Sequence, residues 1–184
     1  MIEAIPRSDQ IDQLARTVAY LSARLEIADC LNCYCRGLDR LDADLLRSCF
    51  HPDAIDHHGD FRGGVDLFVP WAIEIEGRYA RTHHNITTQN CEIDGDVAHV
   101  ESYVTWFVVE GERRILAGGG RYADRFEARG GAWRIAARQL ILDWRLQGEG
   151  DMAVGTQGYP AGARDGSDPS YARPFILPDI GDRS

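Results

Sequence analysis

The sequence has no apolar run that could cross a membrane. Its longest strongly apolar stretch is Val104 to Val109, whereas a membrane-spanning helix needs roughly 18 such residues. The N-terminus, MIEAIPRSDQ, also lacks the apolar segment of a secretory signal. Together these two absences favour a cytoplasmic protein.

An excess of basic residues is missing as well. The chain has 20 Lys+Arg against 29 Asp+Glu and a formal net charge of −9. Nucleic acid and anionic membranes would on average repel this charge, so neither is an expected partner. With 184 residues, 44% hydrophobic and 27% charged, the composition suits one soluble domain and excludes a disordered or collagen-like chain.

The five cysteines form no paired framework. Their number is odd, and the C-x-x-C pair of Cys30 and Cys33 is followed by no second pair. A structural zinc site usually takes four ligands, so zinc is disfavoured here. The pattern predicts reduced thiols that serve as small apolar residues on a buried helix face.

Three helices are expected in the first half of the chain. Residues 8–36 predict a long helix that Ser8 caps and Gly37 stops. Its apolar residues recur in steps of three and four and form one continuous stripe, Ile11, Leu14, Val18, Leu21, Leu25 and Ala28. Residues 42–50 and 64–79 predict two shorter helices, the second of which Pro70 could kink or divide.

Four strands are expected after Thr82, at residues 84–93, 97–109, 113–127 and 132–145. Asp94-Gly95 is typical of a hairpin turn between the first two. The consecutive glycines 118–120 lie inside a strand with no helix start after them, which favours a bend in a curved sheet over a phosphate site. Helices followed by an antiparallel meander indicate an α+β fold.

Composition changes again at the C-terminus. We expect one domain over residues 1–147 and a tail rich in Gly, Pro and Asp over residues 148–184. The apolar segment 171–178 predicts that part of the tail docks, on the body of the protein, on a neighbouring protomer or over a cavity mouth.

The adjacent histidines His83 and His84 are the first candidates for chemistry. They open a predicted strand, so one must point inward and the other outward. An inward histidine needs a hydrogen-bond partner, and a carboxylate would raise its basicity. Asp39 and Asp42, after the long helix, are the candidate partners.

The segment HPDAIDHHGD, residues 51–60, is dense in histidine and carboxylate. A metal site built around His57 and His58 is one hypothesis, although strand alternation would scatter the ligands over two faces. A polar strand with one histidine facing a pocket is the favoured interpretation. Tyr34 could donate a hydrogen bond to a substrate oxygen, or it could simply be a core aromatic.

Several phrases, in this order and spacing, resemble the SnoaL-like branch of the nuclear transport factor two-like superfamily. They are Tyr34-Cys-Arg-Gly-Leu-Asp39, Thr82-His-His84, Ile93-Asp-Gly-Asp-Val-Ala98, Gly120-Arg-Tyr-Ala-Asp-Arg-Phe126 and Trp133-Arg-Ile-Ala-Ala-Arg138. The resemblance spans residues 10–146. It implies a cone-shaped α+β domain in which a curved antiparallel sheet wraps a long N-terminal helix and encloses an apolar pocket.

The same resemblance implies a site. The family includes scytalone dehydratase, bile-acid 7α-dehydratase, hexachlorocyclohexane dehydrochlorinase and polyketide cyclases, several of which use a His–Asp dyad and no cofactor. The matching catalytic positions here are His84, Asp39 and Tyr34. The substrate-binding candidates are His58, Arg138 and Tyr103, of which His58 stands where the dehydratases have a second tyrosine.

The expected function is therefore a cofactor-independent lyase without a metal, acting on a hydrophobic cyclic or aromatic molecule. Dehydration, a related elimination, or C–C cleavage with loss of formaldehyde would all suit the dyad. The alternatives are a polyketide cyclase or isomerase, and a non-catalytic small subunit or ligand-binding module, since a fold alone does not prove catalysis. By analogy a homo-oligomer is expected, a trimer or dimer formed through the outer sheet face.

Overall fold

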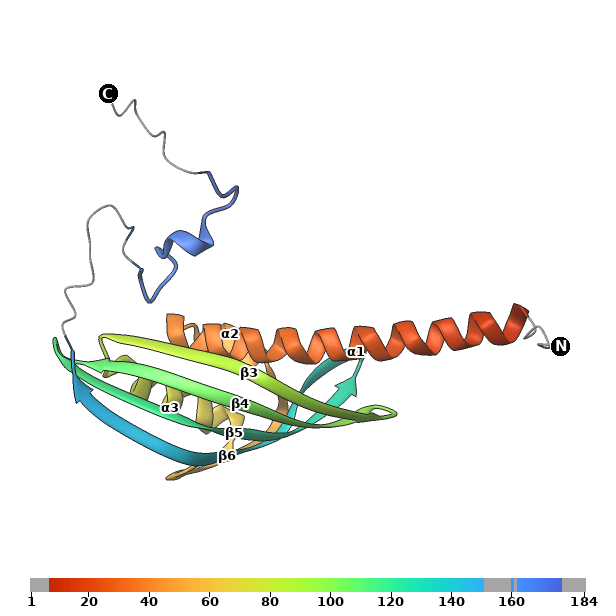
Figure 1. The fold of residues 1–184 in the computed structure, drawn as a ribbon, viewed down its shortest axis with the longest axis horizontal. Helices are drawn as coiled ribbons and strands as arrows, with labels where there is room; N and C mark the ends of the chain where they lie inside the picture. Colours follow the sequence, from red (N-terminus) through yellow and green to blue (C-terminus); the bar gives the residue numbers. More distant parts are fainter. Residues whose placement is uncertain (1–6, 151–159, 161, 177–184) are drawn as a thin grey trace.

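The computed structural model describes residues 7–150, 160 and 162–176. It shows an α+β fold in which a long N-terminal helix lies along a curved sheet (Figure 1). The element order is α1 (Arg7–Arg40), α2 (Ala43–Ser48), β1 (Phe50–His58), β2 (Phe61–Gly64), α3 (Val65–Gly77), β3 (Arg81–Asp94), β4 (Val97–Glu110), β5 (Arg114–Arg129), β6 (Ala132–Glu149) and the 3-10 helix η1 (Pro169–Tyr171). No helix in these described ranges is long and apolar enough to span a membrane.

Helix α1 is longer than the sequence predicts at both ends. It already includes Ser8, so this residue lies in the first turn and does not cap it. At the other end Gly37 does not stop the helix. A Cβ at Gly37 would lie 2.9 Å from the backbone nitrogen of Leu46, so glycine is needed there because α2 packs closely against α1.

Helix α1 ends at Arg40, three residues after Gly37, in a Schellman motif. Leu41 adopts a left-handed conformation with φ of 53°. Its N–H donates to the carbonyl of Leu38, and the N–H of Asp42 donates to the carbonyl of Gly37. Asp42 then caps α2 by accepting from the N–H of Leu45. The chain therefore reverses at Leu41, two residues after Asp39.

The face of α1 that packs on the sheet is not the stripe apparent in the sequence. The buried row is Ala23, Ile27, Leu31, Tyr34 and Leu38. The stripe from Ile11 to Leu25 lies on another side of the helix and is exposed. Sequence periodicity thus predicted the helix correctly but did not identify its core-facing side.

The sheet has six strands in the order β2-β1-β6-β5-β4-β3. The four long strands β3 to β6 form the expected antiparallel meander. Strands β1 and β2 fall where a polar strand and turn were expected, but β1 pairs with β6 in parallel, so the sheet is not purely antiparallel. Helix α3 runs through Pro70 without division.

The glycines 118–120 allow the sheet to bend and two tryptophans to pack. A register shift separates Gly119 from Gly120 in the pairing of β5 with β6. A Cβ at Gly118 would overlap the ring of Trp106, and one at Gly119 would overlap the ring of Trp144. The favoured interpretation of a bend in a curved sheet is confirmed.

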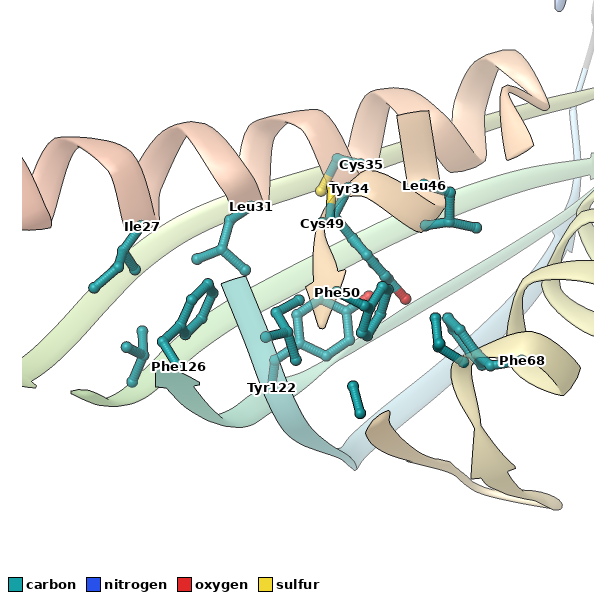
Figure 2. Close-up of a cluster of buried hydrophobic side chains, with 14 of the residues drawn as sticks. Ile27, Leu31, Tyr34, Cys35, Leu46, Cys49, Phe50, Phe68, Tyr122 and Phe126 are labelled. Atoms are coloured by element: carbon teal, nitrogen blue, oxygen red, sulfur yellow. The ribbon is translucent and has the colours of Figure 1, made fainter. Parts of the chain in front are cut away.

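The main core lies between α1 and the sheet. Figure 2 shows its central side chains reaching from α1, β1 and α3 toward β5. The ring of Tyr34 packs edge-on against Phe50 and Tyr122, with centroids 5.9 and 5.6 Å apart. One face of β4, which includes Ala98, Val100 and Val104 at alternate positions, is buried here.

Part of the C-terminal tail docks on the body. The guanidinium of Arg36 lies 4.3 Å from the ring centroid of Tyr171, and Arg40 pairs with Asp168 at 3.5 Å. Tyr171 is the first residue of the apolar segment 171–178. Phe175 and Ile176 of the same segment are exposed, and residues 177–178 lie outside the described residues. Among the described residues, docking therefore depends on the start of this segment and on charged and polar contacts just before it.

Candidate active site

His84 and Asp39 form a hydrogen-bonded pair at the end of α1. Nδ1 of His84 lies 2.8 Å from Oδ1 of Asp39, and the backbone N–H of His84 donates to Oδ2 at 3.0 Å. The hydroxyl of Thr82 donates to Oδ1 at 3.0 Å. His83 is exposed on the opposite face of β3, as strand alternation predicts.

The contacts of Asp39 favour its ionised form. Burial alone would raise the pKa of this carboxyl. The hydrogen bonds from His84 and Thr82 and the charge of His84 outweigh burial and lower the pKa below its usual value. An ionised Asp39 accepts a hydrogen bond from Nδ1–H of His84, so when the ring is neutral its lone pair is on Nε2.

The other side of His84 faces a cavity of about 240 Å³ between α3 and the sheet. Its wall is mostly apolar and aromatic, with polar atoms at a few places. The lining residues are Tyr34, Leu38, His58, Phe68, Trp71, Ala72, Ile75, Glu76, Tyr79, His84, Trp106, Val108, Tyr122, Leu140, Leu142 and Arg145. A concave apolar pocket with few convergent polar groups is typical of a site for a small molecule.

Glu76 is a second carboxyl beside the same imidazole, and sequence reasoning missed it. Oε1 of Glu76 lies 3.9 Å from Nε2 of His84, and Oε2 is buried without a hydrogen-bond partner among the described residues. Burial raises the pKa of Glu76, and the nearby charges of His84 and Arg164 offset this only in part. A signal existed, because Glu76 continues the row of buried residues Phe68 and Ala72 at helical spacing.

Tyr34 reaches the cavity from the middle of the core. Its side chain is fully buried, and its hydroxyl has no hydrogen-bond partner within the described part of the chain. Burial raises the pKa of Tyr34 well above its usual value, so the phenol stays neutral and remains a donor. An unpartnered buried hydroxyl on a cavity wall is available to a ligand oxygen.

His58 belongs to a second histidine–carboxylate pair across the cavity. Its Nδ1 lies 3.2 Å from Oδ1 of Asp56, a residue that is 1% exposed. The ring of His58 sits among aromatic rings, with its centroid 5.6 Å from Phe68 and 6.0 Å from Tyr122. The structure thus brings His58 to the cavity and pairs it with Asp56, one of the carboxylates of segment 51–60.

Arg138 packs against two tyrosines of the cavity wall and does not itself line the cavity. It forms two hydrogen bonds of 2.7 Å with Asp124, and both side chains are fully buried. Its guanidinium lies between the rings of Tyr34 and Tyr122, 4.1 and 4.0 Å from their centroids. Contact with substrate was expected of Arg138, but the two tyrosine rings separate it from the cavity.

A match to the SnoaL-like domain model extends over residues 19–139 and therefore includes the dyad, Glu76 and most of the residues that line the cavity. The chain belongs to the SnoaL-like family. A relative, an uncharacterized protein of Mycobacterium tuberculosis strain H37Rv, is 33% identical over 138 residues. This alignment covers 70% of the present chain and 90% of the relative.

Two solved structures show the same SnoaL-like fold. The type 2 hexachlorocyclohexane dehydrochlorinase LinA superposes with a TM-score of 0.69 at 20% identity, covering 76% of this chain and 99% of its own. A candidate scytalone dehydratase from Novosphingobium aromaticivorans superposes with a TM-score of 0.66 at 21% identity. This superposition covers 71% of the present chain and 90% of the dehydratase chain. At these identities the likeness establishes the fold.

Other predicted residues lie away from the cavity of this SnoaL-like domain. Tyr103 is on the outer face of β4, because only the even-numbered residues of that strand face the core. His51 bonds the carbonyl of Glu127 at 2.8 Å, and His57 lines a groove on the outer sheet face. The histidines of segment 51–60 are thus scattered, and the described residues hold no group of three or more potential metal-ligating side chains.

The docked tail adds a clamp to the SnoaL-like domain next to the dyad. The guanidinium of Arg164 donates to carbonyls at the ends of α1 and α3 and to one side chain. Its acceptors are Leu38 O, Asp39 O, Glu76 O, Tyr79 O and Thr82 Oγ1, at 2.7 to 3.3 Å. Arg164 therefore ties together the segments that carry both carboxyls facing His84.

Proposed function

We propose that this protein is a cofactor-independent lyase that eliminates water, or a comparable leaving group, from a small hydrophobic cyclic or aromatic substrate. The observation that carries the proposal is the placement of His84. One ring nitrogen is bound to Asp39 at 2.8 Å, and the other faces a mostly apolar cavity beside Glu76.

The cavity restricts the size of the substrate. An apolar cavity of about 150 Å³ can hold benzene, and this cavity measures about 240 Å³. A single six-membered ring with a few substituents is therefore the substrate class that fits. The aromatic residues Trp71, Trp106 and Phe68 would stack on or against such a ring.

His84 is the proposed base. Nε2 carries the lone pair and takes a proton from a substrate carbon next to the one that bears the leaving group. Asp39 holds the ring in this tautomer and stabilises the imidazolium as it forms. The electron pair of the broken C–H bond becomes the new C=C bond, and the bond to the leaving group breaks.

Glu76 and Tyr34 are the proposed partners of the leaving oxygen. A raised pKa favours the protonated form of Glu76, which can give its proton to a departing hydroxide and so release water. The phenol of Tyr34 would donate a hydrogen bond to the same oxygen or to a carbonyl that activates the C–H bond. After product leaves, the imidazolium of His84 returns its proton to Glu76, 3.9 Å away.

The names of the neighbours support this class of reaction. A dehydrochlorinase and a dehydratase both denote eliminations, and both names belong to chains with this fold. Elimination also needs only acid and base groups, which the cavity contains.

The test is turnover on a panel of monocyclic hydroxylated and halogenated compounds, without added cofactor or metal and with product mass followed by mass spectrometry. We expect wild type to give a product lighter by water or by hydrogen halide. His84→Ala should be inactive, and His83→Ala, which alters the exposed neighbour, should retain activity. Tight binding by wild type without any mass change across the panel would contradict the lyase and favour a binding module.

A further inference from the structure

A second apolar face of α1 remains without a function in the site just described. Its residues Ile11, Leu14, Val18, Leu21 and Leu25 are each more than half exposed. They lie on a side of the helix different from the buried row that packs on the sheet. Figure 1 shows the N-terminal part of α1 extending past the ends of the strands, so part of this face projects beyond the body.

The spacing of these residues is that of a coiled coil. Steps of three and four place Ile11, Val18 and Leu25 at successive a positions, and Leu14, Leu21 and Ala28 at successive d positions. A helix that only covers a sheet needs a broader apolar face and no strict a/d seam. Contiguous exposed apolar surface of this kind marks a contact with another molecule.

The residue types at these positions indicate how many helices meet. β-Branched residues at a, as in Ile11 and Val18, with leucine at d, as in Leu14 and Leu21, favour two strands over three or four in a parallel coiled coil. The next a position is Asn32, which is exposed, and a single polar residue at an a position fixes register in such pairs. Beyond it the seam ends, because the following d position, Cys35, is buried.

The flanking charges agree with a parallel pair of identical chains. In a parallel dimer the g position of one helix faces the e position of the next heptad on the other. Here Arg24 at g would face Asp29 of the partner subunit, once on each side of the seam. Arg24 bonds Tyr20 and Cys91 through Nη1, and among the described residues its other nitrogens make no hydrogen bond, so they can reach across the seam.

We infer that this protein forms a homodimer through a parallel two-stranded coiled coil of α1, with a second copy of the chain covering the face from Ile11 to Ala28. The two sheets would lie on the outer sides of the helix pair, because each sheet packs on the face of α1 that carries the buried row and not on the face that forms the seam. This interface differs from the outer sheet face that family resemblance suggests. It is also independent of the proposed reaction.

The oligomeric state of the full chain tests this inference. We expect a dimer by light scattering after size-exclusion chromatography, and a dissociation constant at least hundredfold weaker for Leu14→Glu/Leu21→Glu, since charges would face each other across the seam. Leu67→Glu, which changes an exposed leucine on α3, is the matched control and should stay dimeric. Circular dichroism should show that all variants keep the fold.

Two further variants test the register and direction. Arg24→Glu should weaken the dimer, and adding Asp29→Arg should restore it. Leu14→Cys should form a disulfide between chains on oxidation, because identical d positions meet only in a parallel pair. A monomeric wild type, or an oligomer that Leu14→Glu/Leu21→Glu leaves intact, would overturn the interface; cross-linking of Leu14→Cys only to Leu25→Cys would overturn its direction.

Discussion

His84 is joined to the carboxylate of Asp39 twice, through Nδ1 of its ring at 2.8 Å and through its backbone N–H at 3.0 Å. The backbone bond fixes the carboxylate relative to the strand, and the side-chain bond fixes the ring relative to the carboxylate. The position of Nε2 in the cavity is therefore set by both α1 and β3. This double attachment is the structural basis for the first prediction.

Removing either member of the dyad should stop turnover without unfolding the protein. A positioned general base contributes about 10²- to 10⁴-fold, so His84→Ala and Asp39→Asn should each lower kcat by about that factor. Steady-state kinetics and a thermal melt would check this result. Wild-type activity in either variant would remove the dyad from the mechanism, and His83→Ala provides the control for an altered β3 sequence.

Glu76 should give the pH profile of kcat/KM an alkaline limb, in which kcat/KM falls as pH rises. Its folded pKa is raised, so the protonated form persists to higher pH than for an ordinary glutamate and is lost as pH rises through that raised value. We expect kcat/KM to fall along this limb in wild type. Glu76→Gln should be about 10²-fold slower and lack the limb, because its amide does not titrate. Glu74→Gln, on the exposed side of α3, should leave the profile unchanged.

The buried Arg138–Asp124 pair should matter mainly for stability and for the pose of Tyr34. Removing one partner of a buried ion pair costs about 3–5 kcal/mol, so Arg138→Met should lower the free energy of unfolding by roughly that amount. Arg138→Met/Asp124→Leu leaves no unpaired charge and should recover much of the loss. Denaturant titration would measure both. A double variant as unstable as the single one would show that the cation–tyrosine stacking dominates.

Arg164 should couple the tail to the active site. Its contacts are charge-assisted hydrogen bonds to carbonyls at the ends of α1 and α3, and a bond to a charged group contributes about 1.5–3 kcal/mol. Arg164→Ala should therefore lower the melting temperature and reduce kcat through a misplaced Asp39. Arg173→Ala, an exposed change in the same tail segment, should do neither. Unchanged kinetics in Arg164→Ala would restrict the clamp to a structural role.

The sequence predicted the elements better than their contacts. Hydrophobic periodicity and turn signals gave three helices and four long strands close to their observed bounds. Periodicity could not tell which side of α1 is buried, since the exposed stripe is as regular as the packed row. Gly37 appeared to stop the helix because the close packing of α2 against it is a tertiary contact that local signals do not contain.

The residues of the candidate site were also predicted from the sequence only in part. Residue type and family resemblance pointed to His84, Asp39, Tyr34 and His58, all of which the structure places at the cavity or directly behind it. Tyr103 and Arg138 carry suitable chemistry, but strand alternation places the first outside and two tyrosine rings shield the second. Helical spacing places Glu76 on the buried face of α3 with Phe68 and Ala72, but it does not reveal that His84, on a distant segment, lies opposite.

By itself the sequence determined the order of helices and strands, the α+β class and the presence of a histidine and an aspartate suited to acid–base chemistry. These properties follow from spacing and residue type along a single segment. Only the tertiary structure decided that the aspartate meets the histidine, that a second carboxyl lies on the far side of the ring, and that one face of α1 remains exposed. Each of these depends on segments far apart in the chain, whose relative placement is set by packing.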